Sequence, residues 1–138
     1  CTTNCKSLTL MFQKEVAERI IARPGSKARS RISLKTELFT NAKIVFNIPA
    51  TCFIPRPKVD SSLLHFEVLS EPKYRFNPVK LDQILTYAFN QKRKMLKSSL
   101  KALFSDVSNR LNSVGIIETE RPEVVELVKF CDLSLIDE

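Results

Sequence analysis

The hydrophobic pattern changes its period once along this chain, and this change limits the folds that the chain can adopt. In residues 1–70, short apolar runs predict strands at Ser7–Phe12, Lys43–Ile48 and Val59–Leu69. The first strand should be mostly buried, because it is apolar and bounded by polar residues. Helical spacing in Gln13–Arg23 predicts a helix directly after that strand. We therefore expect an α/β domain over this part of the chain.

After a polar linker candidate, Ser70–Asn77, apolar residues recur every three to four positions instead. Four helices are expected, with these apolar stripes: Leu81, Ile84, Leu85 and Ala88; Leu96, Leu100, Leu103 and Phe104; Val107, Leu111 and Val114; and Val124, Leu127, Val128 and Cys131. Gly115 should end the third helix, and Pro122 should open the fourth. The pattern predicts a small all-α domain over residues 75–138.

The net charge of +7 is unevenly distributed. Residues 1–70 carry 11 Lys/Arg against 5 Asp/Glu, residues 71–104 carry 8 against 2, and residues 105–138 carry 3 against 8. A basic body with an acidic end favours a polyanionic partner such as nucleic acid, against the alternative of an ordinary solvated surface. No apolar run is long enough to span a bilayer, and the start lacks an export signal, so we expect a cytoplasmic protein without a membrane partner.

The cysteines do not form a recognisable metal-binding pattern. Cys1, Cys5, Cys52 and Cys131 are not spaced as zinc pairs, and only His65 can add a nitrogen ligand. We expect reduced thiols and no metal. The lone histidine is interpreted as a residue of the sheet surface, not as a catalyst.

Two prolines restrict the loop that joins the second and third predicted strands. Pro55 and Pro57 fix their own φ angles and hold the preceding residues, Ile54 and Arg56, in extended conformations. Phe53 therefore begins a loop with little freedom, which suits a ring that meets a flat ligand face-on. The alternative, which this loop alone favours, is a rigid connector with Phe53 buried in the core.

Cations are concentrated after the first helix of the second domain. A predicted helix that can follow a phosphate backbone carries five cations on one face: Lys92, Arg93, Lys94, Lys97 and Lys101. Asn90 and Gln91 can add hydrogen bonds to bases or sugars. The alternative is a solvated helix face, but acidic partners at i±4 spacing are missing, which favours a binding role.

Four ordered motifs resemble a known family. They are Leu8–Ala17, Phe53–Ser61, Phe89–Lys94, and Arg121–Glu123 with Phe130–Cys131. Together they resemble the small-subunit rRNA adenine dimethyltransferases of the bacterial KsgA type, over nearly the whole chain from Ser7. The resemblance implies an S-adenosylmethionine-dependent enzyme that dimethylates two adjacent adenines of small-subunit rRNA, on the 30S pre-ribosome.

The resemblance also implies roles for individual residues. Phe53 corresponds to the aromatic residue that stacks on the flipped-out adenine, in agreement with its rigid loop. The expected RNA-binding residues are Arg56, Lys58, Asn90, Gln91, Lys92, Arg93, Lys94 and Lys97. Arg29-Ser30 stand where the family usually has Tyr-Gly, which should make that surface more basic.

The chain departs from the family at the cofactor site. Its only glycines are Gly25 and Gly115, so the glycine-rich loop that cradles the cofactor is absent. Asn47–Ala50 resembles the catalytic tetrapeptide but lacks its final aromatic residue, and is interpreted as a strand end. We therefore expect the C-terminal half of such an enzyme: the last strands of a Rossmann-like sheet followed by a small all-α domain, inactive alone and not binding S-adenosylmethionine.

Two other functions stay open at this point. One is a stand-alone RNA- or ribosome-binding module without catalysis, and the weaker one is an unrelated basic α/β domain that binds proteins. A sheet cut in the middle leaves an open edge, which tends to pair with another chain. We accordingly expect self-association through the strand at Leu8–Phe12.

Overall fold

The computed structural model describes residues 5–136. They fall into two compact units. The first unit holds the described residues up to Ala22 together with Ile32–Lys73, and the second holds Arg23–Arg31 together with the described residues from Tyr74 onward. The functional domains expected at 1–70 and 75–138 stay a prediction.

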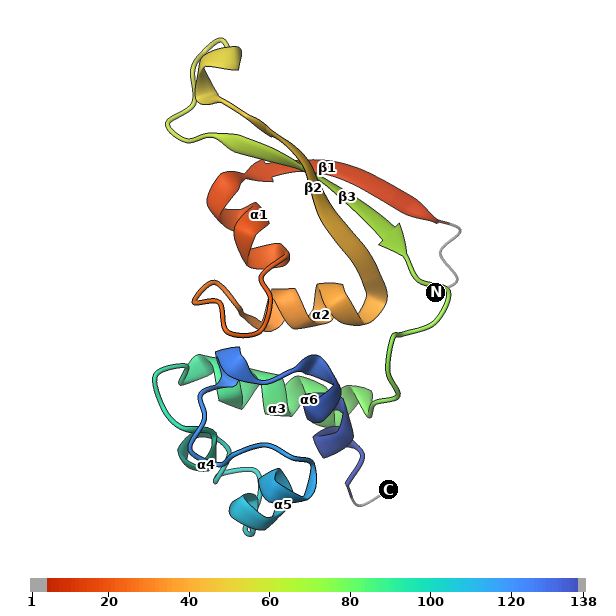
Figure 1. Cartoon of the computed structure of the whole chain (residues 1–138), viewed down its shortest axis with the longest axis vertical. Coiled ribbons are helices and arrows are strands. Elements are labelled where there is room, and N and C mark those ends of the chain that lie inside the picture. The colour runs from red at the N-terminus through yellow and green to blue at the C-terminus, as the bar shows by residue number, and fades with distance from the viewer. Residues whose placement is uncertain (1–4, 137–138) are drawn as a thin grey trace. The chain divides into compact units, whose positions relative to one another are not determined.

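The first unit contains a three-stranded sheet (Figure 1). Its strands are β1 (Ser7–Gln13), β2 (Thr40–Ile48) and β3 (Ser61–Val68), in the order β1-β3-β2. The central strand β3 is antiparallel to both neighbours, so β1 and β2 run in the same direction. The predicted strands are thus confirmed, with ends shifted by a few residues.

Helix α1 (Lys14–Ile20) follows β1 directly and covers one face of the sheet. Its residues Ala17 and Ile20 are buried against Leu64 and Phe66 of β3. The partly buried side chains around this core are Phe12, Val16, Ile21, Ala42 and Ile44. Helix α2 (Arg31–Phe39) precedes β2, and within it the Ser33 hydroxyl donates a hydrogen bond of 2.5 Å to the Arg19 carbonyl.

Strand β1 forms where predicted, but the expectation that it is mostly buried is wrong. Leu8, Leu10 and Met11 are 43%, 45% and 52% exposed. The strand lies at an edge of the sheet, and of its residues Phe12 is the one that packs against the core. An apolar sequence sets the tendency to be buried, but burial also requires an element that covers the strand.

The second unit is built around the pair of helices α3 (Pro78–Asn90) and α6 (Leu127–Ser134). Helix α3 begins as its sequence predicts, because the Asn77 side chain accepts a hydrogen bond of 3.1 Å from the Lys80 N–H and proline occupies the first turn. The predicted stripe is buried, with Leu81, Ile84, Leu85 and Ala88 all 4% exposed or less.

Two of the other predicted helices are wrong in extent. Helix α4 (Leu96–Ser99) has only four residues, and its first two N–H groups, those of Leu96 and Lys97, bond to the carbonyls of Glu120 and Glu118. Pro122 opens a separate 3-10 helix, η2 (Pro122–Val124), and not α6.

Helix α5 (Val107–Ser113) matches the prediction. It is followed by Gly115 with a φ of 80°, a conformation that favours glycine.

The described part of the chain contains no helix long and apolar enough to cross a membrane. Residues 5–136 also hold no cluster of three potential metal ligands. Within them, Cys5 and Cys52 are exposed free thiols and Cys131 is buried, whereas Cys1 lies outside this range. His65 is half-buried, with its Nδ1 2.7 Å from the Thr9 hydroxyl on the neighbouring strand.

Candidate functional site

The loop between β2 and β3 lies where three strand ends meet. Gln13 at the end of β1 and Ile48 at the end of β2 both pair with Ser61 at the start of β3. Figure 1 shows the β2–β3 hairpin extending past α1, with the 3-10 helix η1 (Ala50–Cys52) near its tip. In open α/β sheets, ligands bind beyond the carboxyl ends of the strands, and β1 and β2 both end here.

Phe53 begins the extended part of this loop. Its backbone has a φ of −111° and a ψ of 148°, and its N–H donates a hydrogen bond of 3.2 Å to the Ala50 carbonyl. The side chain is half-buried and does not belong to the hydrophobic core of the unit. The following Ile54–Pro55 peptide bond is cis. The ring is therefore partly accessible on a loop that its own backbone bonds hold.

Asp60 ties the two ends of this loop together. One oxygen of its carboxylate, Oδ1, accepts a hydrogen bond of 2.8 Å from the Ala50 N–H. Its backbone carbonyl accepts another, of 2.9 Å, from the N–H of Lys14 at the start of α1. Nearby, the Ser62 hydroxyl lies 2.6 Å from the side-chain oxygen of Asn47, which stands in β2. Asn47–Ile48 thus ends a strand, as the sequence predicts.

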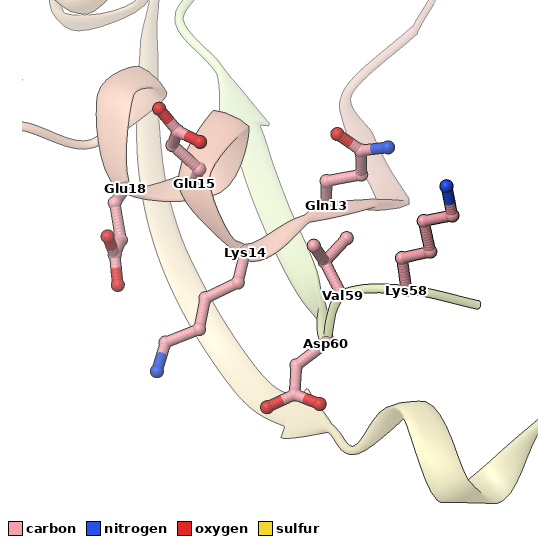
Figure 2. A pocket seen from close by; sticks show the side chains of 7 residues that line it. All are labelled: Gln13, Lys14, Glu15, Glu18, Lys58, Val59 and Asp60. Carbon is pink, nitrogen blue, oxygen red and sulfur yellow. The ribbon is translucent and has the colours of Figure 1, made fainter. Parts of the chain in front are cut away.

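An open cleft of about 470 Å³ lies beside Asp60 (Figure 2). Its lining residues are Gln13, Lys14, Glu15, Glu18, Lys58, Val59 and Asp60. Lys58 is one of the expected RNA-binding residues, and Arg56, four positions before Asp60, is exposed. The mixture of lysines and carboxylates suits a polar ligand with both donors and acceptors.

The predicted basic helix is wrong, although the cations are where the sequence places them. Helix α3 ends at Asn90, and residues 91–94 form a turn closed by a hydrogen bond of 2.9 Å from the Lys94 N–H to the Gln91 carbonyl. Of the five cations, only Lys97 stands on a helix, the short α4. We call residues 90–94 the basic turn. In it, the exposed residues are Asn90, Gln91, Arg93 and Lys94.

Lys92 differs from its neighbours in the basic turn. It is half-buried, and its Nζ donates a hydrogen bond to the backbone carbonyl of Lys27. The segment Arg23–Arg31 belongs to the same unit and is also held by a bond of 2.7 Å from the Gly25 N–H to the Glu123 carbonyl. Sequence reasoning missed this docking, since no local pattern links positions 65 residues apart.

Arg29 corrects another expectation. Its side chain is 1% exposed, so it does not make the surface around Arg29-Ser30 more basic. The exposed cations of this segment are Arg23, Lys27 and Arg31, and the last donates a hydrogen bond of 2.9 Å to the Thr86 hydroxyl. A guanidinium can be buried where it is paired with other groups. The sequence position of an arginine therefore does not by itself place its side chain at the surface.

Comparison with known proteins identifies the family of this chain. Residues 2–135 match the family described as "Ribosomal RNA adenine dimethylase", and the chain therefore belongs to that family. The chain is 48% identical over 129 residues to "Ribosomal RNA small subunit methyltransferase A" of Roseobacter denitrificans, and 48% identical to the protein of that name from Cereibacter sphaeroides. Each alignment covers 94% of this chain and 46% of the relative, so the chain spans about half their length.

Solved structures agree with this assignment. A dimethyladenosine transferase from Plasmodium falciparum superposes with a TM-score of 0.74 at 25% identity, over 96% of this chain and 57% of that protein. The 23S rRNA methyltransferase ErmE superposes with a TM-score of 0.65 at 21% identity, over 93% of this chain, which shows a shared fold. The three-stranded sheet with its helices is therefore part of a methyltransferase fold.

Residues 5–136 do not include a glycine-rich cradle of the kind that holds a nucleotide-type cofactor. A cradle for such a cofactor needs glycines in the turn between a strand and a helix. Gly25 instead lies in the loop after α1, and Gly115 lies in the turn after α5. Neither glycine follows a strand, so no cofactor contact is assigned to the described residues.

Proposed function

We propose that this chain forms the target-base and RNA-docking part of an enzyme that dimethylates two adjacent adenines of small-subunit rRNA. The observation that carries the proposal is Phe53, whose partly accessible ring lies beyond the carboxyl ends of β1 and β2. Chemistry on the exocyclic amine of an adenine requires the base to leave its stack. An aromatic ring on a restrained loop offers that base a face to stack on.

The second unit holds helices α3, α4, α5 and α6, and we call it the helical unit. It supplies a surface for docking on RNA. We propose that the residues from 75 onward form an all-α RNA-binding domain, and that the residues up to 70 complete a Rossmann-like methyltransferase domain. Support comes from the exposed Arg93 and Lys94, which can neutralise phosphates, and from Asn90 and Gln91 beside them. Arg56, Lys58 and Lys97 are proposed as further contacts, on the small-subunit rRNA of a 30S pre-ribosome in the cytoplasm.

The methyl donor of the whole enzyme is proposed to be S-adenosylmethionine, as in the family that the sequence resembles. We propose that this chain does not bind it alone, because neither glycine stands after a strand. The same observation favours a second function, a stand-alone module that binds RNA or ribosomes without catalysis. Both functions predict RNA binding, but only the first predicts methyl transfer.

Methyl transfer to small ribosomal subunits separates these functions. The substrate is small subunits from cells that lack the dimethylated adenines, and the donor is S-adenosylmethionine labelled in its methyl group. We expect the full-length gene product that contains this sequence to label the rRNA, and the 138-residue chain to bind the subunits without labelling them. A full-length product that binds the small subunits but does not label their rRNA would establish the second function, a binding module without catalysis. Absence of binding by both proteins would leave a protein-binding domain.

A further inference from the structure

We propose that Asp60 is a positioning residue for the target base, because it fixes the loop that carries Phe53. This inference rests on the proposed function of Phe53 as a stacking platform. Asp60 itself does not need to touch the RNA. It acts through the backbone of Ala50, which is hydrogen-bonded both to the Asp60 carboxylate and to the Phe53 N–H.

The connection consists of two hydrogen bonds in series. The Ala50 N–H donates to Asp60 Oδ1 at 2.8 Å, and the Ala50 carbonyl accepts from the Phe53 N–H at 3.2 Å. Ala50 takes part in both bonds and is only 5% exposed, so it cannot shift without disturbing the residues around it. Through these two bonds, the carboxylate of Asp60 on the other side of the loop restrains the backbone of Phe53.

Asp60 satisfies a donor that has no partner in its own helix. Ala50 is the first residue of η1, and the first N–H groups of a helix lack intrahelical acceptors. The preceding residue, Pro49, makes no side-chain cap bond, so this end of η1 depends on an acceptor from elsewhere in the chain. A carboxylate that accepts from a backbone N–H makes a charge-assisted bond, which is among the stronger ones in proteins.

The same residue ties the loop to the rest of the unit. The Asp60 carbonyl accepts a hydrogen bond of 2.9 Å from the N–H of Lys14, the first residue of α1. Asp60 therefore contacts the chain after β1, the chain after β2 and the start of β3, all at the edge where the strands meet. Asp60 lines the cleft, and Figure 2 shows it next to Val59 with its carboxylate pointing away from the side chains of Gln13 and Glu15. A side chain in this place can hold Phe53 at a fixed distance from the whole sheet end.

The test uses three variants of the full-length gene product that contains this sequence. Asp60→Ala removes the acceptor of the Ala50 N–H. Asp60→Asn removes the charge but keeps a side-chain oxygen that can accept this hydrogen bond. Ala50→Pro removes the N–H donor from the other side, and the extended Pro49, with a ψ of 146°, tolerates a following proline. The measurements are kcat for methyl transfer, the Kd for small subunits, and hydrogen exchange of the Ala50 amide where that amide remains.

We expect Asp60→Ala to lower kcat by roughly 10- to 100-fold, as for a reacting group that is misplaced by about 1 Å, and to leave the Kd unchanged. Asp60→Asn should restore most of kcat and the exchange protection of Ala50. Ala50→Pro should reproduce the loss, and the double variant should lose no more than either single one. If Asp60→Ala does not fold, Ala50→Pro and Asp60→Asn decide the question by themselves.

Two outcomes would overturn the inference. The first is a wild-type kcat in Ala50→Pro, or in Asp60→Ala after the Ala50 amide has lost its protection. The second is an Asp60→Asn variant as slow as Asp60→Ala, because the carboxylate charge would then matter and not the hydrogen bond. Phe53→Ala serves as the reference. A loss in Phe53→Ala without one in Asp60→Ala refutes this inference alone, and a normal Phe53→Ala refutes the proposed function.

Discussion

The side-chain amine of Lys92 donates a hydrogen bond to the backbone carbonyl of Lys27, 65 positions earlier in the chain. This bond joins the basic turn to the segment Arg23–Arg31 within the helical unit. One of the cations expected to bind RNA therefore already has a structural partner. The cations of the basic turn should accordingly differ in what their removal does.

Removal of the Lys92 amine should cost stability. Lys92→Met keeps the apolar stem but loses the donor, so we expect the free energy of unfolding to fall by about 1 kcal/mol. Hydrogen exchange should accelerate at the Gly25 amide, which is bonded to the Glu123 carbonyl in the docked segment. Urea unfolding and amide exchange measure both effects. Lys94→Met, at an exposed position, is the control and should change neither, and equal behaviour of the two variants would disprove the anchoring role.

Removal of the exposed cations should instead weaken RNA binding. Each of Arg93→Ala and Lys94→Ala should reduce the slope of log affinity against log salt by roughly 0.7 to 0.9, because one phosphate contact is lost. Thermal stability should not change, since both side chains are exposed. Filter binding to small-subunit rRNA over a salt series gives the slope. Lys43→Ala, an exposed cation on β2, is the control, and an unaltered slope in the Arg93–Lys94 double variant would remove the basic turn from the interface.

The Asp106 carboxyl should titrate below its ordinary pKa of 3.8, chiefly because the Arg110 side chain donates a hydrogen bond to it at 2.7 Å. A pKa that is lower in the folded state contributes to stability above the unfolded pKa, and this contribution is lost as the pH falls through the folded pKa. Arg110→Gln should raise the pKa of Asp106 and shift this loss to higher pH. NMR titration of the carboxyl carbon tests the shift, with Arg121→Gln as a control that should leave it unchanged. A pKa of Asp106 that is the same with and without Arg110 would contradict this assignment.

The exposed edge strand β1 should cause the isolated chain to self-associate. Leu8, Leu10 and Met11 remain exposed at an edge, where another strand can pair. Leu10→Lys should reduce association, because a charged side chain at a sheet edge opposes pairing. Light scattering over a concentration series measures the mass. Val79→Lys, on the exposed surface of α3, should associate like the wild-type chain, and a wild-type chain that stays monomeric would show that the edge is not used.

The elements that could be predicted from the sequence are those whose pattern and end signals agree. Helix α3 combines a buried stripe with a capping Asn77 and a proline in its first turn, so its start needs no tertiary information. Strand β3 alternates buried Leu64 and Phe66 with the less buried His65, and period two is sufficient to assign it. The restrained loop after Phe53 is predictable for a similar reason, because two prolines restrict a backbone locally, whereas the stacking role of Phe53 comes from the family resemblance and stays a prediction.

The elements that could not be predicted depend on contacts across the chain. The run from Lys92 to Lys97 contains no helix breaker, yet the chain turns there because Leu96 and Lys97 bond to carbonyls near residue 120. The sequence does not identify Asp60 as a site residue, since its partners Ala50 and Lys14 lie 10 and 46 positions away. Its place between a proline loop and a strand was the one available signal.

The most direct test of the account compares methyl transfer and ribosome binding for Phe53→Ala and Phe53→Tyr in the full-length gene product. Because a stacking platform acts on the extruded base and not on docking, Phe53→Ala should lower kcat by about 10- to 100-fold, the worth of one base–aromatic stack of ~1–3 kcal/mol. The Kd for small subunits should stay within about twofold, and Phe53→Tyr, which keeps the ring, should retain most of the activity. Equal losses of kcat and affinity in Phe53→Ala, or no loss of either, would contradict the central claim that Phe53 holds the target adenine.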